Sequence, residues 1–197
     1  MQNLKGYDSG HDWWHIKRVR KLSIYINEIE MLSDPFTVEI TALLHDTADS
    51  KFAGDNSDQA YESIRDFIET NGMLEISDQV LSAIMKVSFS SNKQTSSSDD
   101  PLLWVIQDAD RLDAIGAIGI ARAFNYGGFR NNPIWIPDEK PLNQSKSTIG
   151  HFYDKLLKLK DMMNTQTGRI VAEQRHNILE QFLEQFYSEW HFIKDKR

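Results

Sequence analysis

Two adjacent polar residues, His45 and Asp46, follow the apolar run EITALL in this sequence. An imidazole and a carboxylate are costly to bury side by side unless a partner satisfies them. A divalent metal ion would do so, because it accepts an imidazole nitrogen as a ligand and compensates the charge of a carboxylate. The alternative is a solvated turn at a helix end, since the residues that follow, Thr-Ala-Asp-Ser, are typical of turns.

Asp49 and Lys51 follow this pair closely in the chain. Asp49 lies three residues after Asp46, so on a helical turn the two carboxylates would reach the same region. One carboxylate could bind a metal ion while the other aligns or deprotonates a water molecule. The ammonium group of Lys51 is a compact positive charge that suits phosphate oxygens.

Two further histidines, His11 and His15, are four residues apart in HDWWHIKR and would share one face of a helix. The spacing resembles that of zinc sites, but Asp12 stands where a metalloprotease has its longer glutamate base. His15 and Arg18 are three residues apart, which would place a metal ligand beside a guanidinium group that binds phosphate. A lone histidine in a helix is more often a core or surface residue, so the residues alone leave both interpretations open.

A third candidate is Asp110, in the segment QDADRLD. At about 100° per residue, one helical face there contains Leu103, Ile106, Asp110, Asp113, Ala114 and Ala117. Asp108 and Arg111 are predicted to point away from that face. An unpaired carboxylate in an apolar stripe is expensive, so Asp110 binds either a metal ion or, alternatively, a buried arginine or backbone donors.

The elements that would position these residues are all predicted to be helices, because apolar residues recur at helical spacing and no strand-like alternation does. We predict helices over residues 11–31, 36–47, 57–70, 77–87, 101–124, 148–163 and 167–193. Residues 125–150, which contain Gly-Gly and three prolines, are predicted to form a long loop that its apolar residues keep ordered. The expected fold is a single compact all-α domain over residues 1–197, with about six to nine helices.

Composition narrows the class of protein. The chain has 197 residues, of which 40% are hydrophobic and 26% charged, as in ordinary globular domains. It contains no cysteine, which excludes disulfides and thiolate metal sites and favours a reducing, cytoplasmic location. No run of about 18 apolar residues occurs, so we expect no membrane span. The net charge of −7 argues against a nucleic acid polymer as a partner.

The order His15, then His45-Asp46, then Asp110 resembles the HD superfamily of metal-dependent phosphohydrolases. The similarity is greatest to the small bacterial HD hydrolases of the YpgQ/YedJ kind. It extends to flanking segments that together cover most of the chain: GHDWWHIKRV, ALLHDTADSKF, VSFSSNK, STIGHFYDKLLKL and TGRIVAEQRHNILEQFLEQF. An isolated His-Asp pair would be a weak motif, whereas the ordered set with its flanks is specific.

The resemblance implies that His15, His45, Asp46 and Asp110 are the metal ligands. Dinuclear members of the superfamily add histidines between the His-Asp pair and the final aspartate, and this chain has none between residues 46 and 110. One divalent ion is therefore favoured over two. Two imidazole nitrogens and two carboxylates suit Mn²⁺ best, with Mg²⁺, Co²⁺ and Ni²⁺ as alternatives.

The resemblance also assigns roles around the metal ion. Asp49 would assist catalysis, although a glutamate is the familiar residue there and the shorter side chain departs from the pattern. His11 would lie on the substrate side, and phosphate contacts would come from Arg18, Lys51 and Lys93.

The implied activity is hydrolysis of a (deoxy)nucleoside triphosphate to the monophosphate and pyrophosphate, through a metal-activated water molecule. The alternatives are a phosphomonoesterase acting on nucleoside monophosphates, a non-catalytic module that senses metal and nucleotide, and an oxidative di-iron enzyme. The lack of additional histidines argues against a di-iron enzyme. The expected partner is a small-molecule nucleotide, bound by a monomer or a homodimer.

Overall fold

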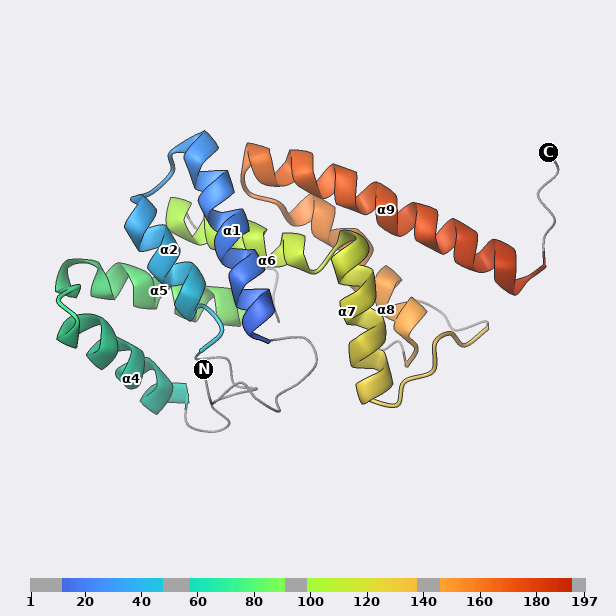
Figure 1. Cartoon of the computed structure of the whole chain (residues 1–197), viewed down its shortest axis with the longest axis horizontal. Helices are drawn as coiled ribbons and strands as arrows, with labels where there is room; N and C mark the ends of the chain where they lie inside the picture. The colour runs from blue at the N-terminus through green and yellow to red at the C-terminus, as the bar shows by residue number, and fades with distance from the viewer. Residues whose placement is uncertain (1–11, 48–56, 91–98, 138–145, 193–197) are drawn as a thin grey trace. The chain divides into compact units, whose positions relative to one another are not determined.

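The computed structural model describes residues 12–47, 57–90, 99–137 and 146–192, which form eight α-helices, one 3-10 helix and no strand (Figure 1). The prediction of an all-α fold is therefore confirmed. In chain order the elements are α1 (Trp13–Glu30), α2 (Pro35–Leu44), α4 (Ser57–Thr70), α5 (Leu74–Ser90), α6 (Pro101–Asp113), α7 (Gly116–Phe129), α8 (Thr148–Asp154), the 3-10 helix η2 (Leu156–Met162) and α9 (Gln166–Trp190).

The described residues divide into two compact units. The first extends from residue 12 to Asp110, and the second from Arg111 to residue 192, so that α6 begins in one and ends in the other. The single domain expected over residues 1–197 stays a prediction.

In the first unit, α2 packs against both α1 and α5, and α5 packs against α4. The core between α4 and α5 consists of Ile64, Ile68, Val80, Leu81 and Ile84, and Ile40 and Leu44 of α2 pack against it. Because α1 and α2 run side by side in opposite directions, the first turn of α1 lies at the same end as the last turn of α2 (Figure 1). That end carries the candidate metal ligands.

The connection between α1 and α2 is held by the buried side chain of Asn27. Its amide oxygen accepts hydrogen bonds from the backbone N–H groups of Leu32 and Ser33, at 3.1 and 2.9 Å, and its amide nitrogen donates to the carbonyl of Ser33 at 2.8 Å. Farther along the pair, the guanidinium group of Arg20 donates two hydrogen bonds to one carboxylate oxygen of Glu39. These contacts fix the register of α1 against α2.

In the second unit, α7 and η2 pack against α9, and α8 packs against α7 and η2. The single helix predicted over residues 101–124 is wrong, because α6 ends at Asp113 and α7 starts at Gly116. Gly116 adopts a left-handed conformation with φ of 74°, which favours glycine and interrupts the helix. Arg175 donates to the carbonyl of Leu112 at 2.5 Å, so a side chain satisfies a carbonyl in the last turn of α6.

Other predicted boundaries also move. The helix expected over 148–163 is α8 followed by η2, the helix expected from residue 77 begins at Leu74, and the helix expected over 36–47 ends at Leu44. The loop predicted over 125–150 begins only after Phe129 and ends before α8. Its Trp135 packs on the end of α9, with its ring centroid 5.0 Å from that of Trp190.

Candidate metal centre

His15 lies in the first turn of α1 and is fully buried. The helix begins here because Asp12 is its N-cap: its backbone is extended, and its carboxylate accepts a hydrogen bond from the N–H of His15 at 2.8 Å. Apolar residues of α1 that follow, Ile16 and Val19 among them, are buried. The signal for this cap in the sequence is the aspartate three residues before His15, in a position where Asp12 was compared only with the glutamate base of a metalloprotease.

His45 comes directly after the last residue of α2 and is 1% exposed. Its Nδ1 lies 2.8 Å from the carbonyl oxygen of Ala42. A carbonyl only accepts, so Nδ1 carries the proton and Nε2 of the neutral ring keeps its lone pair. That Nε2 is buried and has no hydrogen-bond partner among the described residues. A histidine oriented in this way by a backbone carbonyl is typical of metal ligands.

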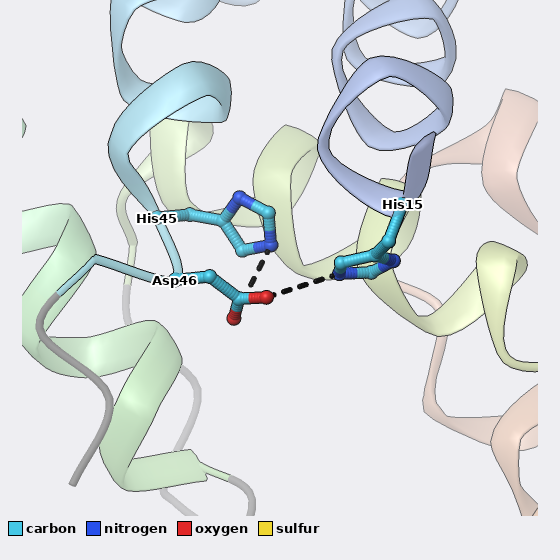
Figure 2. Close-up of side chains that lie close together, drawn as sticks. All are labelled: His15, His45 and Asp46. Carbon is cyan, nitrogen blue, oxygen red and sulfur yellow. Dashed lines mark ion pairs between the residues drawn. The ribbon is translucent and has the colours of Figure 1, made fainter. Parts of the chain in front are cut away.

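Asp46 brings its carboxylate between the two imidazoles (Figure 2). One carboxylate oxygen lies 3.3 Å from Nε2 of His15, and the other lies 3.5 Å from Nε2 of His45. Ligand atoms of all three residues lie within 4.8 Å of one another. Ligands placed about 2.1 Å from a shared ion are separated by roughly 3–4 Å, so this donor set fits a divalent cation.

Asp110 of α6 lies beside this cluster, with its Oδ1 3.5 Å from Nε2 of His15. It is not among the residues whose ligand atoms all lie within 4.8 Å of one another. The side chain of Asp110 is 40% exposed, whereas its place in an apolar helical face predicted that it would be buried. Asp108, predicted to point away from the buried face, is instead fully buried. The prediction of one buried face on α6 is wrong because this helix is buried on several sides, with Leu102, Val105 and Ala109 in the core as well.

Asp113, predicted on the same face as Asp110, does not join the cluster. Its buried carboxylate accepts a hydrogen bond from Nη1 of Arg122 at 2.6 Å. Arg18 lies on α1, one turn after His15, and is partly exposed. Four further candidates, His11, Asp49, Lys51 and Lys93, lie outside the described residues.

Within the part of the chain that the structure describes, no helix is both long and apolar enough to span a membrane.

Comparisons with known proteins identify the family. The family described as HD domain matches residues 13–115, which include all four candidate ligands. The uncharacterized protein YpgQ of Bacillus subtilis is 41% identical over 186 residues, or 92% of this chain and 85% of that protein. These similarities confirm the resemblance that the sequence predicted.

Solved structures are similar over nearly the whole chain. The crystal structure of Bacillus subtilis YpgQ in complex with ADP has a TM-score of 0.78 and 38% identity, covering 95% of this chain and 93% of that one. The structure of an HD-superfamily hydrolase from Bacillus thuringiensis has a TM-score of 0.76 and 40% identity, covering 96% and 91%.

Proposed function

This chain belongs to the HD domain family, and we propose that it is a hydrolase that uses one divalent metal ion bound by His15, His45, Asp46 and Asp110. The observation that carries the proposal is the buried Nε2 of His45, which has no hydrogen-bond partner among the described residues and faces a carboxylate. Leaving such an atom without a partner is costly, and a metal ion removes the cost.

When bound, a divalent ion at this position would supply Lewis acidity and lower the pKa of water, and Mn²⁺ suits the two nitrogen and two oxygen donors best. The two imidazoles would hold the ion through nitrogen, while Asp46 and Asp110 would offset its charge. The partly exposed side chain of Asp110 marks a solvent-accessible edge of the cluster, through which water and substrate enter.

The remaining groups act on the substrate. Asp49 aligns the attacking water molecule and accepts its proton. Arg18, Lys51 and Lys93 neutralise the phosphate chain, which the net charge of −7 otherwise repels. For His11 we propose a role in binding the substrate.

The proposed substrate is a (deoxy)nucleoside triphosphate. The ADP in the structure of Bacillus subtilis YpgQ supports a nucleotide. Water attacks the α-phosphorus, the bond between the α-phosphorus and the bridging oxygen breaks, and pyrophosphate leaves with that oxygen. The protein acts on free nucleotides in the cytoplasm, as a monomer or homodimer.

Product identification on a nucleotide panel with Mn²⁺ tests this function. We expect monophosphate and pyrophosphate from the wild type, and a loss of at least 100-fold in rate for Asp110→Ala, of the order seen when charge-stabilising groups are removed. Asp78→Ala is the matched control, because Asp78 is a 90% exposed aspartate on α5.

Other results would support a different function. Inorganic phosphate released from monophosphates would identify a phosphomonoesterase, and metal binding without any turnover would identify a sensing module. Pyrophosphate release that survives Asp110→Ala undiminished would exclude this ligand assignment.

A further inference from the structure

We propose that Asp12 is a positioning residue of the metal centre: by capping the first turn of α1, its carboxylate holds His15 within reach of His45 and Asp46. This inference rests on the proposed function, because it concerns one of the proposed ligands. Asp12 itself is exposed and needs no contact with the ion.

The position of His15 in α1 makes it dependent on a cap. It is the third residue of the helix, and the first N–H groups of a helix have no carbonyl partner within it. Asp12 supplies two contacts at this point. Its carboxylate accepts from the N–H of His15 at 2.8 Å, and its carbonyl accepts from the N–H of Ile16 at 3.3 Å.

The start of α1 is only partly buried. Trp13 and Trp14, which precede His15, are 36% and 61% exposed, so the burial of the first turn rests on His15 and Ile16. The polar contacts that fix α1 against α2 and the connection between them come later, at Arg20 and Asn27. Helix ends fray where burial and hydrogen bonding are sparse. The cap therefore has a direct effect on how often the imidazole of His15 occupies the site.

The chain contains a matched control for this cap. Asp34 caps α2 in the same way, with its carboxylate accepting from the N–H of Thr37, also at 2.8 Å. The ligands that α2 positions, His45 and Asp46, lie beyond its other end. Substituting Asp34 therefore removes a similar capping interaction from α2, a helix of the same unit. It leaves intact the turn at the other end of α2, which carries His45 and Asp46.

The test is Mn²⁺ binding by calorimetry to the full-length wild type and to the variants Asp12→Ala, Asp12→Asn and Asp34→Ala. An N-cap is worth about fivefold in a local equilibrium, and the apparent affinity scales with the fraction of competent molecules. We expect Asp12→Ala to weaken binding by up to about fivefold. Asparagine is an equally good cap, so Asp12→Asn retains wild-type affinity, as does Asp34→Ala.

Amide hydrogen exchange of the metal-free protein gives a second readout, which involves neither metal nor activity. We expect faster exchange in the peptide that contains His15 for Asp12→Ala, and wild-type exchange there for Asp12→Asn. Wild-type Mn²⁺ affinity in Asp12→Ala would overturn the inference. So would equal losses in Asp12→Ala and Asp12→Asn, since charge and not capping would then be responsible.

The same measurements distinguish failure of the proposed function from failure of the role of Asp12. A wild type that binds no Mn²⁺ or other divalent ion would overturn the metal centre, and with it the positioning role. Wild-type binding with no effect of Asp12→Ala would overturn the positioning role alone.

Discussion

Nε2 of His15 lies 3.3 Å from a carboxylate oxygen of Asp46, although the two side chains come from the first turn of α1 and the turn after α2. Two helices that meet at one end thus bring a nitrogen and an oxygen donor to the separation that a shared ion requires. Both helices belong to the same compact unit.

Metal binding should stabilise the fold through this cluster. A ligand at 100 times its dissociation constant adds about 2.7 kcal/mol of stability, so saturating Mn²⁺ should raise the melting temperature of the wild type. His45→Ala removes a buried ligand and should abolish most of that increase. His191→Ala, at an exposed histidine in the second unit, serves as the control. A full Mn²⁺-induced increase in His45→Ala would contradict the assignment of His45.

Ser23 offers a test of the interior of α1. Its hydroxyl is fully buried and has no hydrogen-bond partner among the described residues. Because an unsatisfied buried hydroxyl costs about 1–3 kcal/mol, we expect Ser23→Ala to leave the free energy of unfolding unchanged or to raise it by about 1 kcal/mol.

The matched change is Thr41→Val, since the buried hydroxyl of Thr41 donates to the carbonyl of Thr37 at 2.7 Å. Its loss should lower the free energy of unfolding by about 1 kcal/mol. Urea denaturation of both variants measures the contrast, and a Ser23→Ala variant less stable than Thr41→Val would disprove it.

Two neighbouring glycines of α7 should respond in opposite directions to alanine. A Cβ at Gly127 would lie 2.1 Å from the hydroxyl oxygen of Thr148, whereas a Cβ at Gly128 would meet nothing within 4 Å. Overpacking of this kind costs about 1–3 kcal/mol, so Gly127→Ala should be destabilised. Gly128→Ala should gain up to about 1 kcal/mol, because alanine is the better helix former. Thermal denaturation of the pair checks the prediction, which equal melting temperatures would refute.

The cap of α2 predicts a specific response to acid. Hydrogen bonds from the N–H and the hydroxyl of Thr37 lower the pKa of Asp34 below 3.8. The folded protein therefore holds this proton less tightly than the unfolded chain, and the cap stabilises the fold above pH 3.8. Its contribution should be lost as the pH falls through the depressed pKa.

Comparing the wild type with Asp34→Ala isolates this contribution. The stability difference between them should be constant at neutral pH and should shrink as the pH is lowered past 3.8. Denaturation midpoints measured across that range provide the check, and a difference that grows in acid would show that the sign is wrong.

The sequence identified the candidate metal ligands better than it predicted which residues are buried around them. His45 and Asp46 could be selected because a buried pair of polar residues after an apolar run is costly, and that cost is a local property. His15 was selected only through the resemblance to the HD superfamily. The geometry of Asp110 and Asp108 could not be obtained in this way. Which side of α6 is buried depends on the elements packed around it, and periodicity along one helix does not reveal them.

The helix boundaries likewise depend on contacts with residues distant in sequence. The break before Gly116 is accompanied by a contact distant in sequence, because Arg175 donates to the carbonyl of Leu112. The pair Gly127-Gly128, expected within a loop, is helical. The first of these glycines permits the close approach of Thr148. A glycine that opens a turn and a glycine that admits a neighbouring helix look identical in a sequence.

The hydrogen bond from Nδ1 of His45 to the carbonyl of Ala42 preorganises this ring as a nitrogen donor. The last turn of α2 holds the ring through its own backbone, with Nε2 3.5 Å from a carboxylate oxygen of Asp46. An ion bound as proposed would therefore require no change of tautomer at His45. The way in which one helix ends would thus prepare the site for its ion.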